Sequence, residues 1–281
     1  YPGARVDSEA KVYQYWFSEE LIDEWDWSER FPAQPETERY LNYVADKFDL
    51  RRHSEFHTRV NAAHWDEGGR GGRVGTEQGE RFSGRYFISC AGVLSVPKVP
   101  DIPGQERFGG TVVHTARYPR EGLDLKGKRV GVVGCGATGV QVIQTIAGEV
   151  EHLTAFQRTP CYGIAIRNDK LDDATREQWR AQSSETKERV WNTFVGFQFD
   201  FDNGAWDDYT PEERREVLER LWADGSLAPW VGGFEEVFFD EDANAEMSEL
   251  AREQSSAQVK DPAPAAKLTP RTAGCGTARG P

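Results

Sequence analysis

The chain has 281 residues, 38% of them hydrophobic, with a formal net charge of −13 and a pI near 5.0. This length suffices for one large domain or two ordinary ones, and the acidic charge disfavours nucleic acid and anionic membrane surfaces as partners. The four cysteines lack metal-ligand spacing and no apolar run is long enough for a membrane span, so we expect a reduced, cytoplasmic protein without structural zinc.

The first part of the chain contains an aromatic run and a predicted helix. The aromatic run, residues 12–17, has the composition of a core segment. Residues 18–25 are expected to form a short helix or a loop. A proline and a glutamate directly after Gln34 are typical of a first helical turn, and apolar residues follow at helical spacing. We therefore predict a helix that begins at Gln34 and ends near Phe48.

Strands are predicted next along the chain. Residues 55–65 and 73–77 flank a glycine-rich turn and are predicted to form a β-hairpin. Residues 84–92 form an apolar run that ends on small side chains, the pattern of a buried strand that backbone or a ligand approaches closely. Prolines interrupt residues 96–104, which we interpret as a linker at a domain boundary.

The central motif is a turn at residues 134–139 with the pattern G-x-G-x-x-G. A valine-rich run precedes it and apolar residues at helical spacing follow it, which predicts a strand, a tight loop and a helix. The glycines let the backbone approach a pyrophosphate, and the first N–H groups of the helix point at the anion. The residues assigned to this dinucleotide site are Gly134, Cys135, Gly136, Ala137, Thr138, Gly139, Val140 and Gln141.

The position of one arginine indicates which nicotinamide cofactor, NAD or NADP, the site would bind. A second strand is predicted at residues 152–156, and Arg158 lies nineteen residues after Gly139 (158 − 139). An NAD site places an acidic residue on the ribose about 20 residues after the motif. An arginine at this position can bind a 2′-phosphate with two N–H groups instead, so the sequence favours NADP. The next residue, Thr159, is assigned to the same cofactor site. The alternative is a structural turn with a surface arginine.

Charged helices that carry several tryptophans are predicted from about Asn168 onward. Thr210 and Glu213 have the spacing of a capping box, and an apolar face follows them. Asp242 begins a helix that is predicted to run through Glu253. The acidic residues concentrated here have no catalytic spacing, and we interpret them as solvated helix faces.

The segment before the glycine-rich turn resembles a family fingerprint. Its pattern, Phe108-x-Gly110-x-x-x-His114-x-x-x-Tyr118-Pro119, is similar to that of the Baeyer-Villiger monooxygenases, with Tyr118 where the family usually has tryptophan. Further segments that look like family landmarks are residues 5–7, 17–20, 40–50, 92–97, 156–160 and 242–244. These flavoproteins use NADPH and O2 to insert an oxygen atom beside a ketone carbonyl, which yields an ester or a lactone.

The resemblance implies an α/β, two-dinucleotide-binding flavoprotein fold in which the FAD and NADP domains are each Rossmann-like. The implied domains are a partial FAD-binding domain at residues 1–95, an NADP-binding Rossmann domain with its linker at 96–167, a helical insertion at 168–267 and a truncated return at 268–281. The implied cofactors are FAD and NADPH, and the implied substrates are a small ketone and O2. The oligomeric state stays open.

The resemblance also assigns residues to the flavin side. In the family an arginine over the flavin stabilises negative charge on oxygen, and an aspartate orients this arginine. Asp7 matches the aspartate, Arg5 lies in the same loop, and Tyr13 is similar to a further FAD contact. Arg279 follows a Leu-x-Pro motif at the matching distance and is the candidate catalytic arginine. Ala278 replaces a lysine and the surrounding residues differ, so a chance arginine is the alternative.

The resemblance gives His114 and Tyr118 a conformational role. No metal partners accompany His114 in the sequence, so we expect a hydrogen-bonded histidine at a domain junction. In the family this region links cofactor binding to domain rotation.

We expect the chain to be an internal fragment. It begins at Tyr1 without Met, has no counterpart of the family's first G-x-G-x-x-G turn, and ends at Pro281 before much of the ketone pocket. The isolated chain is therefore expected to hold no tight flavin and to be inactive. Two other interpretations stay open: a flavin monooxygenase that oxidises nitrogen or sulfur, and a non-catalytic NADP-binding module or pseudoenzyme.

Overall fold

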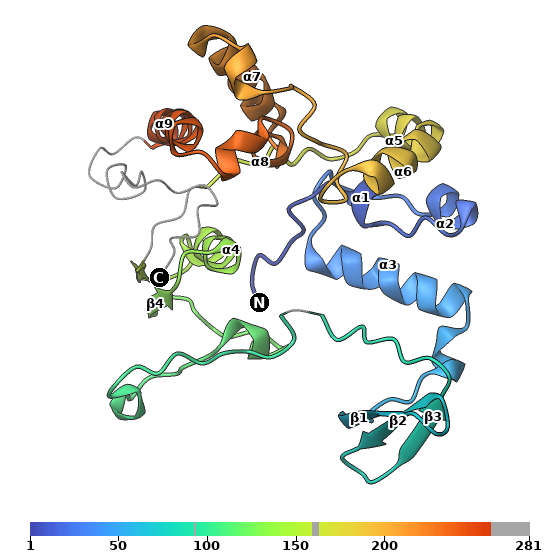
Figure 1. Cartoon of the computed structure of the whole chain (residues 1–281). Coiled ribbons are helices and arrows are strands. Elements are labelled where there is room, and N and C mark those ends of the chain that lie inside the picture. The colour runs from blue at the N-terminus through green and yellow to red at the C-terminus, as the bar shows by residue number, and fades with distance from the viewer. Residues whose placement is uncertain (93, 159–162, 260–281) are drawn as a thin grey trace. The chain divides into compact units, whose positions relative to one another are not determined.

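The computed structural model of the chain describes residues 1–92, 94–158 and 163–259. The chain divides into two compact units, one formed by Tyr1–Tyr40 with Pro119–Pro281 and the other by Leu41–Tyr118 (Figure 1). This division follows packing, whereas the predicted cofactor domains are defined by function, so their boundaries stay predictions.

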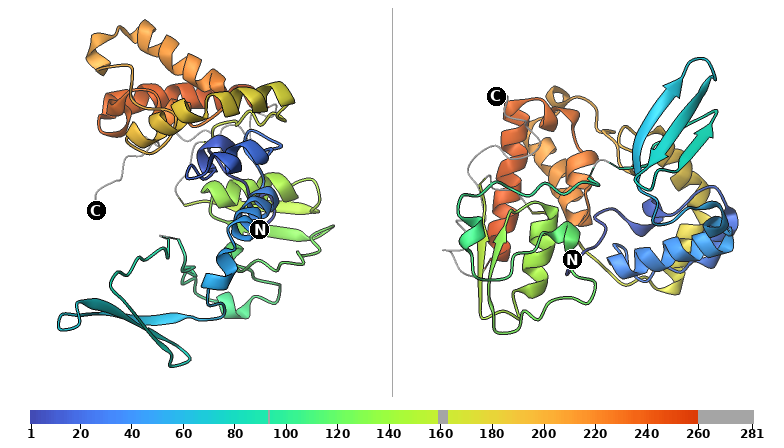
Figure 2. Two further views of the ribbon diagram at one scale, coloured as in Figure 1. Left: turned by 90° about the vertical axis from the view of Figure 1, so that its right-hand side faces the viewer. Right: turned by 90° about the horizontal axis from the view of Figure 1, so that it is seen from below.

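The smaller unit contains a three-stranded antiparallel sheet (Figure 2). Its strands, in spatial order, are β1 (Val60–Asp66), β2 (Gly71–Thr76) and β3 (Arg81–Gly84). Ala63 of β1 lies opposite Val74 of β2. The Asp66 carboxylate accepts a hydrogen bond of 3.2 Å from the Gly69 N–H and stabilises the turn between these strands. The predicted hairpin is therefore confirmed.

The buried strand predicted at residues 84–92 is wrong. β3 ends at Gly84, and the apolar side chains after it are exposed, Tyr86 by 79% and Ile88 by 81%. A buried strand needs a neighbour for its N–H and C=O groups, and among the described strands none pairs with this segment. Residues 96–104 contain neither helix nor strand, which agrees with the predicted linker.

The larger unit contains the predicted β-α-β motif. Its elements are β4 (Arg129–Val133), α4 (Ala137–Ile146) and β5 (His152–Phe156). The two strands are parallel, with Arg129 opposite His152 and Val133 opposite Phe156. Because parallel neighbours need a crossover connection, α4 joins the end of β4 to the start of β5. Val142 and Ile146 form the buried face of this helix.

The N-terminal segment of the larger unit packs around one tyrosine. It forms α1 (Ala10–Tyr13) and α2 (Glu19–Glu24), and it leads into the predicted helix, which is confirmed as α3 (Gln34–Lys47). Tyr40 of α3 is 1% exposed, and the ring centroids of Trp25 and Trp27 lie 5.3 and 4.9 Å from its own. Its hydroxyl oxygen accepts a hydrogen bond of 2.8 Å from the Tyr15 N–H. Tyr40 therefore anchors α3 to the segment before it.

The core role predicted for the aromatic run at residues 12–17 is wrong. Tyr13, Tyr15 and Phe17 are 46%, 42% and 63% exposed. The reason is local, because α1 ends after one turn and the backbone continues extended from Gln14. Successive side chains of an extended segment point to opposite sides, so only part of the run faces the protein.

Among the described residues after β5, the larger unit contains the α-helices α5 (Asp173–Ala181), α6 (Ser183–Asn192), α7 (Pro211–Asp224), α8 (Ala228–Val231) and α9 (Glu241–Gln258). Side chains of α7 and α9, together with others from the segments beside them, form a cluster of buried residues, namely Trp206, Val217, Leu218, Trp222, Phe234, Val237, Ala243, Met247, Leu250 and Ala251. None of the helices in the described ranges is long and apolar enough to cross a bilayer. α9 begins where predicted and ends five residues beyond Glu253.

The predicted capping box at the start of α7 is confirmed. The Thr210 hydroxyl accepts a hydrogen bond of 3.3 Å from the Glu213 N–H, and the Glu213 carboxylate accepts one of 2.8 Å from the Thr210 N–H. Each partner satisfies an N–H group that the helix itself leaves without an acceptor.

The acidic residues of α7 and α9 are not only solvated, as predicted, but in part paired. Arg214 contacts Glu246 at 2.6 Å, and Arg215 contacts Glu219 at 2.6 Å and Glu253 at 2.5 Å. The hydrogen bond that Arg214 donates to the Glu246 carboxylate is the main cause that raises the pKa of Arg214. The pairs with Glu246 and Glu253 join α7 to α9, in addition to the apolar contacts in the core, whereas the pair with Glu219 lies within α7.

Candidate dinucleotide-binding site

The three glycines of the central turn have three different structural roles. Gly134 directly follows β4 and has φ +105°, a conformation that residues with a side chain rarely adopt. Gly136 precedes α4, and a Cβ atom there would meet no protein atom within 4 Å. At Gly139 a Cβ atom would lie 2.3 Å from the carbonyl oxygen of Gly134, so the helix crosses the turn too closely for a side chain. These are the roles that glycines have in a pyrophosphate-binding turn.

The start of α4 is suited to an anion. The first N–H groups of a helix have no intrahelical acceptor, and the helix dipole adds partial positive charge at this end. The first backbone bond inside the helix runs from the Val140 N–H to the Gly136 carbonyl oxygen, at 3.0 Å. The first turn of α4 carries no acidic residue that would compete with a bound anion. The open side of Gly136 therefore leaves space for an anion, and the roles of Ala137 and Thr138 as N–H donors to a pyrophosphate stay predictions.

Arg158 lies at the same edge of the sheet as the glycine-rich turn. The Gly134 N–H donates a hydrogen bond of 2.9 Å to the carbonyl oxygen of Phe156, the last residue of β5. Arg158, two residues further, is exposed and forms no ion pair with a carboxylate in the described ranges. The guanidinium is thus available for a phosphate. The 2′-phosphate contact stays a prediction, and Thr159 lies outside the described residues.

Gln141, predicted as a cofactor contact, binds the N-terminal segment of the chain. Its side-chain Nε2 donates a hydrogen bond of 3.1 Å to the Arg5 carbonyl oxygen. Its Oε1 accepts one of 2.9 Å from the Tyr1 hydroxyl. Both ends of this amide are occupied, although the partners are far away in sequence.

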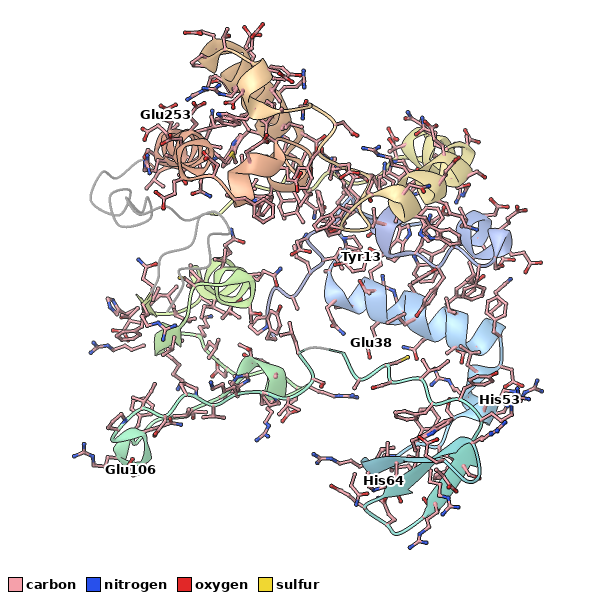
Figure 3. The ribbon with its side chains drawn as sticks, in the orientation of Figure 1. Tyr13, Glu38, His53, His64, Glu106 and Glu253 are labelled. Carbon is pink, nitrogen blue, oxygen red and sulfur yellow. The ribbon has the colours of Figure 1, made fainter. Side chains whose placement is uncertain are left out.

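The three residues predicted for the flavin side lie in this N-terminal segment. The Arg5 guanidinium donates to Glu29 Oε2 at 3.3 Å and to the Phe31 carbonyl oxygen at 3.0 Å, so protein groups occupy it. Tyr13 ends α1 (Figure 3). Partial burial and then the Asp7 carboxylate raise the pKa of Tyr13, which places these two side chains near each other. Their roles toward FAD stay predictions.

Asp7 also lines a small pocket that sequence reasoning missed. The pocket encloses about 210 Å³ of space that is partly open to solvent. Gln198 Oε1 is buried in this region without a hydrogen-bond partner among the described residues. No motif marks these residues, and the only signal is a phenylalanine-rich stretch, 194–201, among charged helices. The pocket is lined by Asp7, Ser8, Glu9, Val12, Phe31, Phe197, Gln198, Phe199, Ser226 and Leu227.

A partly buried ion network that the sequence did not predict holds the loop beside Asp7. Glu9 is 5% exposed and accepts a hydrogen bond of 2.8 Å from Arg30 Nε. Arg30 also donates to the Asp224 carboxylate and to its carbonyl oxygen, each at 2.8 Å. Burial disfavours the charged form of Arg30, but the Glu9 and Asp224 carboxylates outweigh it and raise its pKa. The network therefore joins the Asp7 loop to the end of α7.

His114 has a local structural role. It precedes a 3-10 turn (Thr115–Arg117), and its Nδ1 accepts a hydrogen bond of 3.1 Å from the Ala116 N–H. The hydrogen-bonded histidine is confirmed. Tyr118 directly follows this turn and is the last residue of the smaller unit in sequence. The conformational role of both residues stays a prediction.

Two further predictions concern metals and the catalytic arginine. Within the described ranges, no group of three or more His, Cys, Asp or Glu side chains has the arrangement of a metal site. Arg279 lies outside the described residues, so its assignment stays a prediction.

Known proteins resemble this chain along its whole length. It is 46% identical over 281 residues to the acetone monooxygenase (methyl acetate-forming) of Gordonia sp. strain TY-5, an alignment that covers 100% of this chain and 52% of that protein. It is 39% identical over 272 residues to a Baeyer-Villiger monooxygenase of Pseudooceanicola batsensis, over 96% of this chain and 50% of that one. The chain thus spans about half the length of the curated relatives it matches.

The fold is that of a solved relative. The structure matches the cyclohexanone monooxygenase of Rhodococcus sp. Phi1 bound to NADP+ with a TM-score of 0.90 and 35% identity, over 99% of this chain and 52% of that one. This confirms the expected α/β flavoprotein fold. The sequence profile of the family described as flavin-binding monooxygenase-like matches residues 18–164, just over half of the chain. The chain therefore belongs to the flavin-binding monooxygenase-like family.

Proposed function

We propose that this chain is part of an NADPH-dependent flavin monooxygenase that carries out Baeyer-Villiger oxidation of a small ketone. The net reaction inserts one oxygen atom of O2 between the carbonyl carbon and an adjacent carbon, so that the C–C bond between them breaks and two C–O bonds replace it. The hydride of NADPH and a proton reduce the other oxygen atom to water. Relatives named for acetone and cyclohexanone support this reaction class. The observation on this chain that carries the proposal is the glycine-rich turn with Arg158 at the same sheet edge.

The residues of the turn are assigned to NADPH. The N–H groups at the start of α4 hold the pyrophosphate beside Gly136, and Arg158 holds the 2′-phosphate. Cys135, Gly139 and Val140 complete the turn, while Thr159 is proposed as a further contact. We also propose domain boundaries at residues 95, 167 and 267. The proposed location of the protein is the cytoplasm.

The flavin side is assigned to the N-terminal segment. Bound FAD supplies the redox chemistry, because it accepts the hydride and activates O2. Arg5 and Tyr13 are proposed as contacts of this cofactor. Asp7 orients a catalytic arginine, for which Arg279 is the candidate, and this arginine stabilises negative charge on oxygen in a site from which water is excluded.

Product analysis tests the proposal. The reading frame at the full length of its relatives would be expressed and supplied with NADPH, FAD, 18O2 and acetone or cyclohexanone. We expect an ester or lactone that carries one 18O atom in its ring or ester oxygen. Consumption of NADPH with only hydrogen peroxide, or with oxidation of an amine or a sulfide but no ketone, would contradict the ketone assignment. The 281-residue chain alone is expected to purify without flavin absorbance.

A further inference from the structure

We propose that Gln141 is a positioning residue that couples nicotinamide dinucleotide binding to the loop that carries Arg5 and Asp7. This inference rests on the proposed function, because it takes NADP+ as the ligand at the start of α4. It assigns Gln141 to communication between the two cofactor sides of the larger unit, in place of contact with the dinucleotide.

The first observation is that both ends of the Gln141 amide bind the N-terminal segment. Oε1 accepts from the Tyr1 hydroxyl at 2.9 Å, and Nε2 donates to the Arg5 carbonyl oxygen at 3.1 Å. A side-chain amide that donates and accepts at once fixes both its own orientation and the positions of its two partners. The segment between Tyr1 and Arg5 is therefore fastened to α4 at two points.

The second observation is a close backbone contact between these two points. Gly3 has φ +76°, and a Cβ atom there would lie 2.1 Å from Thr145 Oγ1 and 2.6 Å from the Gln141 carbonyl oxygen. The Thr145 hydroxyl in turn donates a hydrogen bond of 2.8 Å to that carbonyl oxygen. The segment thus lies directly on the backbone of α4, and it follows any displacement or ordering of the helix.

The third observation is that the proposed pyrophosphate position and Gln141 both belong to the same short helix, α4. Gln141 lies five residues after Gly136, so the proposed pyrophosphate position and the amide are separated by little more than one helical turn. A helix moves as a rigid body over this length, because each N–H group is bonded to the carbonyl one turn before it. Ordering of the first turn by a bound anion therefore extends to Gln141.

The coupling continues from the N-terminal segment to the residues around Asp7. The Val6 N–H donates to the Pro32 carbonyl oxygen at 3.2 Å, and the Gln34 N–H donates to the Ala4 carbonyl oxygen at 2.8 Å. These two bonds flank Arg5 and come directly before Asp7. The exchange rates of the Val6 and Gln34 amide protons consequently report whether the loop is fixed.

The test is amide hydrogen exchange of the 281-residue chain, with and without saturating NADP+. In the wild-type chain NADP+ is expected to slow exchange at Val6 and Gln34 by about tenfold, within the usual range of coupling between sites. Gln141→Met keeps the length of the side chain and removes both hydrogen bonds. It should bind NADP+ within about twofold of wild type but lose the slowing. Gln144→Met, on the exposed side of the same helix, is the matched control and should behave as wild type.

The outcomes separate the possible explanations. A purely structural Gln141 would raise exchange equally with and without NADP+, so an unchanged ratio in Gln141→Met would overturn the proposal. Binding of NADP+ to wild type without slower exchange would overturn it as well, and would leave the NADP site standing. Absence of NADP+ binding would instead overturn the proposed function, and the coupling with it. Tyr1→Phe removes one hydrogen bond and keeps the ring, so it serves if Gln141→Met does not fold, and it should show part of the loss.

Discussion

The carbonyl oxygen of Gly134 lies 2.3 Å from the position that a Cβ atom of Gly139 would take. A non-bonded Cβ atom essentially never approaches a backbone oxygen so closely, so any side chain at Gly139 moves α4 away from the turn. Gly136 differs, because a Cβ atom there meets no protein atom within 4 Å. A substitution at Gly139 therefore tests the packing of the turn, whereas a substitution at Gly136 tests ligand binding without disturbing that packing.

For Gly139→Ala we predict loss of both stability and NADPH binding. The methyl group overpacks the turn, which typically costs about 1–3 kcal/mol of unfolding free energy. Chemical denaturation and an NADPH titration measure the two effects. Gly148→Ala is the control, since Gly148 has open space around it and φ is not positive. Wild-type behaviour of Gly139→Ala would show that the close approach does not exist in solution.

For Gly136→Ala we predict a different result. The midpoint of unfolding should stay near that of wild type, because the methyl group enters open space at φ −71°, which alanine adopts freely. NADPH affinity should fall, because this space is where the pyrophosphate approaches the backbone. Unchanged affinity would place the pyrophosphate elsewhere.

Arg158→Ala should weaken NADPH and leave NADH unaffected. Hydrogen bonds to a charged group contribute about 1.5–3 kcal/mol, which corresponds to a loss of about 10- to 150-fold in NADPH affinity. NADH has no 2′-phosphate, so its affinity should not change. Arg129→Ala, at the opposite end of β4, removes the same charge and is the control. Equal losses for both nucleotides would contradict the 2′-phosphate assignment.

Arg30→Met should destabilise the larger unit. Glu9 is 5% exposed and would lose its main partner, although Lys11 remains at 3.1 Å. Breaking a buried ion pair from one side leaves a buried charge, so we expect a loss of about 3 kcal/mol in urea unfolding. The double variant Glu9→Gln with Arg30→Met should recover part of this loss. A loss below about 1 kcal/mol would mean that water solvates the network.

The capping box of α7 should make stability depend on pH. The hydrogen bonds from Thr210 lower the pKa of Glu213 in the folded state. The ionised carboxylate therefore stabilises the fold above the pKa of the unfolded chain, and this contribution is lost as the pH falls through the folded value. Wild type should unfold at higher temperature than Glu213→Gln near pH 7, and the difference should shrink below about pH 4. Glu212→Gln, outside the capping box, is the matched control. A difference that stays constant with pH would contradict this role.

Local signals predicted much of the fold. The proline and acid after Gln34, and the pair Thr210 and Glu213, act within one helical turn, so the starts of α3 and α7 were correct. The β-α-β unit was predicted correctly because the glycines of the turn stand where the local backbone needs them, at a positive φ for Gly134 and at a close backbone contact for Gly139. Such features depend on neighbours in sequence, which a single chain displays directly.

Burial and distant contacts were not predictable in the same way. Ile88 and Phe17 are apolar yet exposed, because burial depends on which segments pack against them. Gln141 binds Arg5 across 136 positions, and Arg30 binds Asp224 across 194, with no spacing rule to connect them. Only the folded structure brings these pairs together.

Titration of the wild-type chain with NADPH and with NADH tests the central claim most directly. The turn and Arg158 together predict that NADPH binds at least about tenfold more tightly than NADH, since the 2′-phosphate adds charge-assisted hydrogen bonds. Quenching of tryptophan fluorescence gives both dissociation constants on the same sample. Equal affinity for the two nucleotides, or binding of neither, would contradict the assignment of this site to NADPH.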